Sequence, residues 1–314
     1  MFVVFDEIHH CSGAEIENAN VWGHQILTKI QSLATYTLAM SGTPWRSDAL
    51  PIVMGRYSAP GGRLLVDYQY TLKQAITDKV CRSPKIVLVD NEHLSVTSDE
   101  KVVSFSSILE MMKQTKTSYQ SVIHNQEAME YLLGLGCNKL AEIRIHSPNA
   151  GGLVVASSVQ HAQTIKKILS QKYAQTVSTV TYRHEEPLAE IERYRQNDSQ
   201  WIVSIGMISE GTDIPRLQVC CHMSSVKTEL YFKQVLGRIL RVNESINQQA
   251  WLFTFAEQSL IDFSERIEQD IPESCMFAKI KSREEIESDT QASSFNEKKT
   301  LRRTGCKGLC TEME

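Results

Sequence analysis

The chain has 314 residues, of which 42% are hydrophobic and 22% charged, so it has the composition of a globular protein and the length for two domains. Its net charge of −4 gives no global signature of nucleic-acid binding, although a local basic surface is compatible with that charge. The eight cysteines form no disulfide framework, no apolar run could span a membrane, and no secretory signal is present, so we expect a reduced, cytoplasmic protein with no membrane partner.

The first part of the chain predicts a strand–helix–strand unit. Residues 1–6 are an apolar run typical of a buried parallel strand, residues 14–32 have helical periodicity, and residues 36–41 predict a second strand. The next predicted elements are a loop at 44–62, a helix near 71–78, a β-branched strand at 85–90 and a mostly helical linker over 91–150.

A second α/β series follows the turn at 147–152, which is the best domain boundary in the sequence. Residues 266–314 then become polar, first acidic and afterwards basic, and predict a mobile tail. In between, strands are predicted at 153–156, 176–182, 201–206, 217–223 and 250–255, and helices at 159–173, 188–195 and 228–241.

Two adjacent carboxylates, Asp6 and Glu7, follow the first predicted strand. Open α/β sheets bind ligands at the carboxyl ends of their strands, where this acid pair is placed. Hydrolysis of a nucleoside triphosphate needs Mg²⁺ held by oxygen ligands and a carboxylate that orients or deprotonates water, and the acid pair can supply both. An isolated pair of adjacent acids lies in a solvated strand-to-loop turn more often than in a catalytic site. The adjoining His9, His10 and Cys11 offer a metal site as an alternative, but contiguous residues ligate one metal ion poorly.

Two turn segments carry small hydroxyl residues after predicted strands. The Ser-Gly-Thr-Pro segment at 41–44 follows the second strand, and the Glu-Gly-Thr-Asp segment at 210–213 follows the strand at 201–206. Hydroxyl groups in such positions can bond a neighbouring acid or a phosphate, and glycine permits a close backbone approach. Each segment alone is also a common turn sequence.

Gln234, Arg238 and Arg241 recur at i, i+4 and i+7 in the last predicted helix, so we expect them to share one helical face. Guanidinium groups bind phosphate oxygens through two parallel hydrogen bonds and keep their charge. The arginine pair, Arg238 and Arg241, can therefore stabilise a transferring phosphoryl group, as an arginine finger does. A solvated arginine face is an equally good interpretation of this helix alone.

The order of the segments is more specific than any one of them, and over roughly residues 1–260 it resembles superfamily 2 DEAD/DEAH-box helicases. Within that superfamily the chain is most similar to bacterial and phage proteins related to the helicase subunits of type I and III restriction enzymes. The segments are Asp-Glu-x-His at 6–9, Ser-Gly-Thr-Pro at 41–44, Leu-Val-Val-Ala-Ser-Ser at 153–158, Glu-Gly-Thr-Asp at 210–213 and Gln-x-x-Gly-Arg-x-x-Arg at 234–241.

The resemblance implies an α/β fold with two RecA-like parallel-sheet domains that hold ATP between them and move along nucleic acid. It implies a partial first domain at 1–90, a helical linker at 91–150, a helicase C-terminal domain at 151–265 and a tail at 266–314. The expected partners are nucleic acid, for which we favour DNA, and subunits of a restriction–modification system.

In the first domain, the resemblance assigns Asp6 to Mg²⁺ through water and Glu7 to activation of the attacking water. It assigns His9, Ser41 and Thr43 to the coupling of hydrolysis to domain movement. The implied cofactors are ATP and Mg²⁺.

In the second domain, the resemblance places Gly211 and Thr212 at the nucleic-acid backbone. It places Asp213 and Gln234 on the nucleotide side, and the arginine pair at the γ-phosphate in a catalytic role. Gly237 would let the arginine helix approach the nucleotide closely.

Several segments of the superfamily pattern are missing. No G-x-x-x-x-G-K-[ST] phosphate loop occurs in the sequence, and neither an adenine-reading segment nor the early nucleic-acid-binding motifs are present. We therefore expect an incomplete first domain, an unpaired apolar edge at residues 36–41, weak binding of ATP and Mg²⁺, and negligible ATP turnover by these residues alone. The first alternative is a non-catalytic remnant that still binds nucleic acid or protein. The second is a different metal-dependent hydrolase built on the acid pair and the histidines. Separately, Cys306 and Cys310 in the tail supply at most half of a zinc site.

Overall fold

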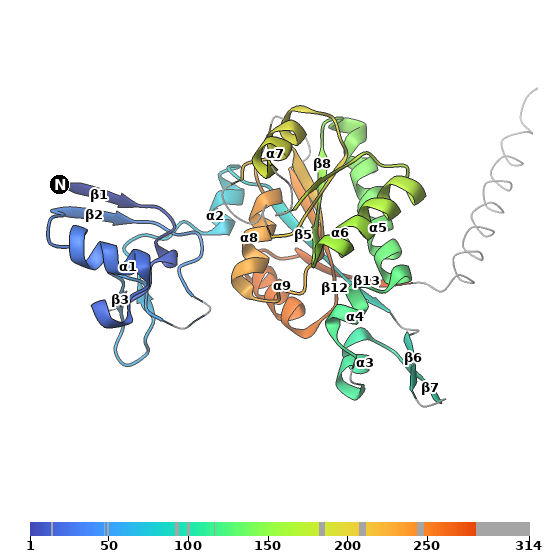
Figure 1. Cartoon of the computed structure of the whole chain (residues 1–314), viewed down its shortest axis with the longest axis horizontal. Helices are drawn as coiled ribbons and strands as arrows, with labels where there is room; N and C mark the ends of the chain where they lie inside the picture. Colours follow the sequence, from blue (N-terminus) through green and yellow to red (C-terminus); the bar gives the residue numbers. More distant parts are fainter. Residues whose placement is uncertain are drawn as a thin grey trace, which may run out of the picture.

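A computed structural model shows an α/β chain in which a small first lobe, residues 1–65, lies beside a larger second lobe, residues 71–280 (Figure 1). The larger sheet is parallel throughout, as in the α/β fold that the resemblance implies. The described residues are 1–13, 15–46, 48, 50–91, 94–98, 101–115, 117–181, 186–206, 212–243 and 248–280.

The first lobe contains the predicted strand–helix–strand unit. Strand β1 (Phe2–Phe5) pairs in parallel with β2 (Tyr36–Ala39), and helix α1 (Val21–Gln25) connects them through the π-helical turn η3 (Ile26–Ile30). Asn20 begins α1, since its side-chain oxygen accepts the N–H of Gly23 at 2.8 Å. The lobe also holds the short helices η1 (Ile8–His10) and η2 (Ile16–Asn18) and the small hairpin of β3 (Arg56–Tyr57) and β4 (Leu64–Leu65).

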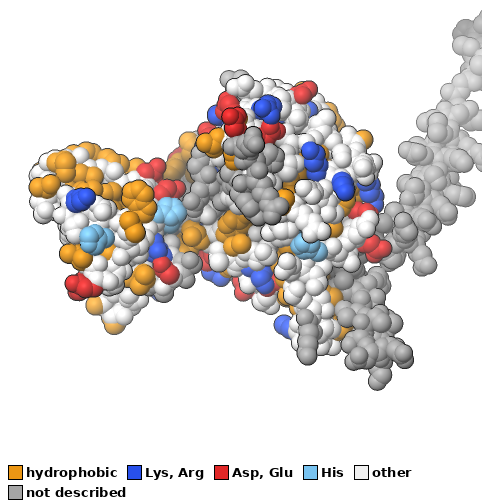
Figure 2. Space-filling model, viewed as in Figure 1, with side chains coloured by type: hydrophobic (Ala, Val, Ile, Leu, Met, Phe, Trp, Pro, Cys, Tyr) orange, Lys and Arg blue, Asp and Glu red, His pale blue; other side chains and the backbone are white. Residues whose placement is uncertain are grey.

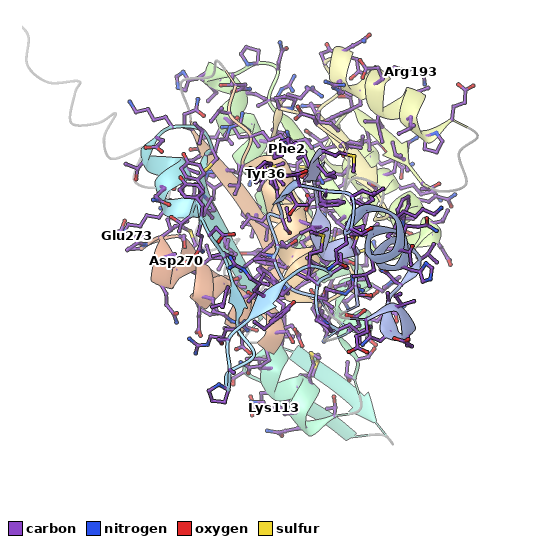
Figure 3. All side chains as sticks on the ribbon, turned by 90° about the vertical axis from the view of Figure 1, so that its left-hand side faces the viewer. Phe2, Tyr36, Lys113, Arg193, Asp270 and Glu273 are labelled. Carbon is purple, nitrogen blue, oxygen red and sulfur yellow. The ribbon has the colours of Figure 1, made fainter. Side chains whose placement is uncertain are left out.

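One face of the β1–β2 sheet is apolar and open. Phe2 pairs with Tyr36 and Val4 with Leu38, and Phe2 is 64% and Tyr36 71% exposed. Apolar side chains gather over these two strands in Figure 2, and Phe2 and Tyr36 lie next to each other in Figure 3. Within the described residues β2 pairs with β1 alone, which agrees with the unpaired apolar edge that the sequence predicts.

The second lobe is a seven-stranded parallel sheet in the order β13-β5-β12-β11-β8-β10-β9. Its central strands are buried along their whole length, which explains why they are continuous apolar runs in the sequence. The strands are β5 (Ser83–Asn91), β8 (Gly151–Ala156), β9 (Val177–Val180), β10 (Trp201–Ser204), β11 (Leu217–Met223), β12 (Gln249–Phe255) and β13 (Cys275–Ile280).

Helices cover both faces of this sheet (Figure 1). Cys221 Sγ lies 3.9 Å from the Leu132 carbonyl oxygen of α5, whereas the ring of His222 lies 6.1 Å from that of Phe232 on α8. Because successive strand residues point to opposite faces, α5 and α8 pack on opposite sides of β11. The helices are α2 (Leu72–Thr77), α3 (Ile108–Gln114), α4 (Tyr119–Ile123), α5 (Gln126–His146), α6 (Val159–Lys167) with η4 (Ile168–Lys172), α7 (Pro187–Gln196), α8 (Glu229–Ile239) and α9 (Gln258–Asp270).

Three expected boundaries differ in the structure. The strand predicted at 85–90 for the first domain is β5, which lies between β12 and β13 in the second lobe, because its fully buried side chains need packing on both faces. The expected linker at 91–150 contains the hairpin of β6 (Leu94–Ser98) and β7 (Lys101–Phe105), as well as α5, which packs in the main core. The expected mobile tail begins too early, because α9 and β13 extend the ordered lobe to residue 280. Residues 281–314, with Cys306 and Cys310, lie outside the described residues.

Candidate functional site

The acid pair lies where β1 ends, as predicted. Glu7 caps the short helix η1 in a left-handed conformation with φ 52° and ψ 44°, and its N–H donates to Asp6 Oδ1 at 3.0 Å. A non-glycine residue in this conformation costs about 1–3 kcal/mol, and such strain is concentrated at functional sites. Both carboxylates are exposed, so their oxygens are accessible to a cation or to water.

His9 connects the acid pair to the loop that follows β2. Its buried ring places Nδ1 2.8 Å from Ser41 Oγ and 3.3 Å from Glu7 Oε2. Ser41 Oγ also accepts the N–H of Thr43 at 3.0 Å, and Arg46 Nη1 donates to the His9 carbonyl oxygen. The structure thus brings together the three residues that the resemblance assigns to coupling.

The alternative metal site receives no support from the described residues. The rings of His9 and His10 lie 4.2 Å apart, but no group of three metal-ligating side chains forms in the part of the chain that the structure describes.

No helix in the described part of the chain is long and apolar enough to cross a bilayer.

The arginine pair contacts the segment at 212–213. Arg238 Nη1 donates to the Thr212 carbonyl oxygen at 2.6 Å, and Arg241 Nη1 lies 3.0 Å from Asp213 Oδ1. The side chains of this ion pair are 43% and 51% exposed, so phosphate oxygens can reach the guanidinium. Four predicted site residues from two separate segments therefore meet at one place in the second lobe.

The helix that carries these residues is shorter than predicted. Thr228 caps α8 by accepting the N–H of Tyr231 at 3.3 Å, and the helix ends at Ile239. Gln234 and Arg238 therefore lie on α8, while Arg241 follows it in an antiparallel bridge with Cys81. The shared helical face expected for all three residues is wrong for Arg241.

No protein atom outside the local helix crowds Gly237, so its close approach to a nucleotide stays a prediction. A Cβ atom built on Gly237 has no heavy atom within 4 Å, so the residue faces open space. Gly211 and Glu210 lie outside the described residues.

A contact between the lobes joins the two candidate segments and was not predicted. Lys233 on α8 places Nζ 4.5 Å from the ring centre of Trp45, which follows Pro44 in the Ser-Gly-Thr-Pro segment. The same Nζ pairs with Glu229 Oε1 at 2.9 Å. One signal in the sequence could have found this contact, namely a large aromatic residue directly after a turn of small residues.

Comparisons with known proteins report similarity in sequence and in fold. Residues 136–243, which extend from α5 past the arginine pair, match the family described as Helicase conserved C-terminal domain. The Uncharacterized protein ML1624 of Mycobacterium leprae is 30% identical over 273 residues, which are 85% of this chain and 44% of that protein. The DNA 3'-5' translocase XPB2 of Sulfurisphaera tokodaii is 23% identical over 292 residues, which are 83% of this chain and 60% of that protein.

A solved structure shows the same fold. The fragment structure of an HsdR subunit of a type I restriction enzyme from Vibrio vulnificus YJ016 has a TM-score of 0.51 at 18% identity, over 78% of this chain and 44% of that chain. The chain spans less than half the length of the M. leprae relative, at 44%. The chain is a superfamily 2 helicase-like protein whose residues 136–243 form a helicase conserved C-terminal domain.

Proposed function

We propose that this chain is part of an ATP-dependent superfamily 2 helicase or translocase that acts on DNA. The main observation in support is that Arg238 bonds Thr212 and Arg241 pairs with Asp213 in the second lobe. The S. tokodaii relative is a DNA translocase by name, which favours DNA as the nucleic acid.

The residues present suit the phosphates of ATP and a hydrated Mg²⁺ ion. Asp6 and Glu7 offer exposed carboxylate oxygens, Arg241 offers an exposed guanidinium group beside the partly buried Arg238, and open space lies at Gly237. ATP with Mg²⁺ supplies the phosphoryl group whose transfer drives movement.

Each group of this chain then has a role. Asp6 holds the hydrated Mg²⁺, Glu7 orients water or accepts its proton, and the arginine pair stabilises charge on phosphate oxygens. The hydrogen bond between His9 and Ser41 connects the acid pair to the loop that contacts α8, and thereby couples the phosphate region to the second lobe. Thr212 and the adjoining segment contact the nucleic-acid backbone.

The test uses the chain alone and the chain joined to the phosphate-loop segment of a relative. We expect the chain alone to bind labelled DNA in a salt-dependent way with negligible ATP turnover, because its sequence has no phosphate loop. The fusion should hydrolyse ATP in response to DNA, and Glu7→Gln or Arg241→Ala should lower turnover by about 10³-fold or more.

Each other outcome has a clear meaning. ATP turnover by the chain alone that vanishes in Glu7→Gln contradicts the expected dependence on a phosphate loop. DNA binding together with an inert fusion favours the second candidate function, a non-catalytic binding module. A chain that binds neither DNA nor RNA at low salt refutes the helicase function and leaves only a protein-binding module of the second candidate. A restriction–modification subunit that co-purifies with the chain would identify the partner suggested by the likeness to an HsdR fragment.

A further inference from the structure

A fully buried arginine, Arg82, contacts both segments of the candidate site in the second lobe. Arg82 lies between α2 and β5 and is 0% exposed. Its Nη1 donates to the carbonyl oxygens of Leu217 at 2.7 Å and Ile239 at 3.2 Å, and its Nη2 donates to that of Pro215 at 3.2 Å. Burial lowers the pKa of Arg82 to about 10, so the group still carries its charge at neutral pH.

The partners of Arg82 come from both segments of the candidate site. Pro215 and Leu217 follow Asp213, and Ile239 lies between the two arginines of the arginine pair. The backbone adds to this link, because the N–H of Arg82 donates to the Leu240 carbonyl oxygen at 2.7 Å and Cys81 forms a bridge with Arg241. One side chain therefore ties the segment at 212–217 to the segment at 238–241.

We propose that Arg82 is a positioning residue that fixes the distance between these two segments, so that Asp213 and the arginine pair meet the nucleotide and the nucleic acid as one unit. The functional half of this proposal rests on the proposed function, whereas the structural half does not. Arg82 is buried away from any ligand and acts only through the two segments.

The chemistry of the contact requires a guanidinium group. A planar fork with several N–H donors can reach carbonyl oxygens on two segments at once, whereas a lysine has donors on a single nitrogen atom. The last carbonyl groups of a helix have no hydrogen-bond partner within the helix and carry partial negative charge, so a nearby cation is favourable. The Ile239 carbonyl oxygen, at the C-terminal end of α8, is one of these groups. A methionine of similar length would leave all three carbonyl oxygens without this donor.

Arg216 provides a matched control. It is also nearly buried and also donates to three carbonyl oxygens, those of Asn149 at 2.9 Å, Tyr194 at 3.3 Å and Ser199 at 2.7 Å. None of these partners belongs to α8 or to the arginine pair. Loss of a buried guanidinium can thus be compared at two places in the same lobe.

The experiment measures backbone hydrogen exchange of the whole chain for the wild type, Arg82→Lys, Arg82→Met and Arg216→Lys. Both Arg82 variants should lose protection at 212–217 and at 238–243 together, while β8 and β12 stay protected. Arg216→Lys should lose protection at 147–150 and 194–200 and keep it at 238–243. If 212–217 and 238–243 keep their protection in Arg82→Lys, or if protection is lost throughout the lobe, Arg82 does not position these segments.

A second readout tests the consequence for function. Binding of fluorescein-labelled oligo(dT) should become about 2- to 30-fold weaker in Arg82→Lys. Unchanged binding in Arg82→Lys, despite the loss of protection, overturns the functional half of the proposal. If the wild type binds no oligonucleotide, the proposed function fails, and hydrogen exchange still decides whether Arg82 positions the two segments.

Discussion

Lys233 Nζ lies 4.5 Å from the ring centre of Trp45, so a cation on α8 contacts an aromatic side chain from the loop after β2. The N–H of Trp45 donates to the Thr43 carbonyl oxygen at 2.8 Å, and Ser41 Oγ accepts the N–H of Thr43. Ser41 in turn bonds His9. A continuous series of contacts therefore leads from the acid pair to the helix that carries Arg238.

We predict that Trp45→Ala and Lys233→Gln each weaken the contact between the two lobes. A cation–π contact at a partly exposed site is worth about 0.5–1 kcal/mol, so its loss should broaden the distribution of distances between the lobes. Small-angle X-ray scattering measures this as a larger radius of gyration. Trp45→Phe and Lys233→Arg keep the aromatic ring and the cation and should scatter like the wild type. Identical curves for all variants would show that this contact does not hold the lobes together.

The central strands of the second lobe could be predicted because buried parallel strands are continuous apolar runs. The same kind of run predicts β1 and β2, although most of their side chains are exposed. The partners of β5 could not be predicted, because β12 and β13 follow it by more than 150 residues and a local pattern carries no information on pairing. The apolar run at 85–90 was therefore assigned to the nearer lobe.

The contact of His9 with Ser41 joins two motif side chains that the sequence singles out, whereas the roles assigned to them stay predictions. Arg82 gave no signal, because its partners are backbone carbonyl oxygens, which every residue has. Arg241 has the spacing of a helical residue, but α8 ends two residues earlier, where the chain pairs with Cys81. Tertiary pairing overrode the helical pattern at this point.

The open space at Gly237 allows a test of whether a ligand occupies it. Alanine is more favourable than glycine inside a helix by about 1 kcal/mol, and no neighbouring atom opposes the added methyl group. Gly237→Ala should therefore raise the free energy of unfolding of the second lobe by about 0.5–1 kcal/mol, as measured by urea denaturation. ATP turnover of the phosphate-loop fusion should fall if the nucleotide fills this space. A stabilised variant with full turnover would place the nucleotide elsewhere.

The left-handed backbone at Glu7 predicts that one substitution there raises the stability of the first lobe and abolishes ATP turnover. Glycine adopts φ 52° without the steric cost borne by other residues, so Glu7→Gly should stabilise the first lobe by up to about 1 kcal/mol. Glu7→Gln is the matched control, because it also removes the carboxylate charge beside His9 but keeps the strained backbone. Both variants should abolish ATP turnover in the fusion. Equal free energies of unfolding for the two variants would show that the conformation at Glu7 stores no strain.

The second lobe should lose stability in mild acid through two buried histidines. Burial and the neighbouring His124 lower the pKa of His161 from 6.5 to about 4, and burial lowers the pKa of His222 to about 4. The unfolded chain therefore binds more protons between these values, and stability that is fully present above pH 6.5 is lost as the pH falls toward 4. Between pH 7 and pH 5 each histidine should contribute a loss of about 2 kcal/mol.

Denaturation by urea at the two pH values measures this loss. His161→Gln keeps a polar group near Ser157, whose Oγ lies 2.9 Å from His161 Nδ1, and it should reduce the difference between pH 7 and pH 5. His24→Gln changes an exposed histidine of the first lobe and should leave the difference as it is in the wild type. If His161→Gln and the wild type lose the same stability, protonation of His161 does not drive the acid sensitivity. The fall would then come from other groups of the lobe, with His222 as the next position to substitute.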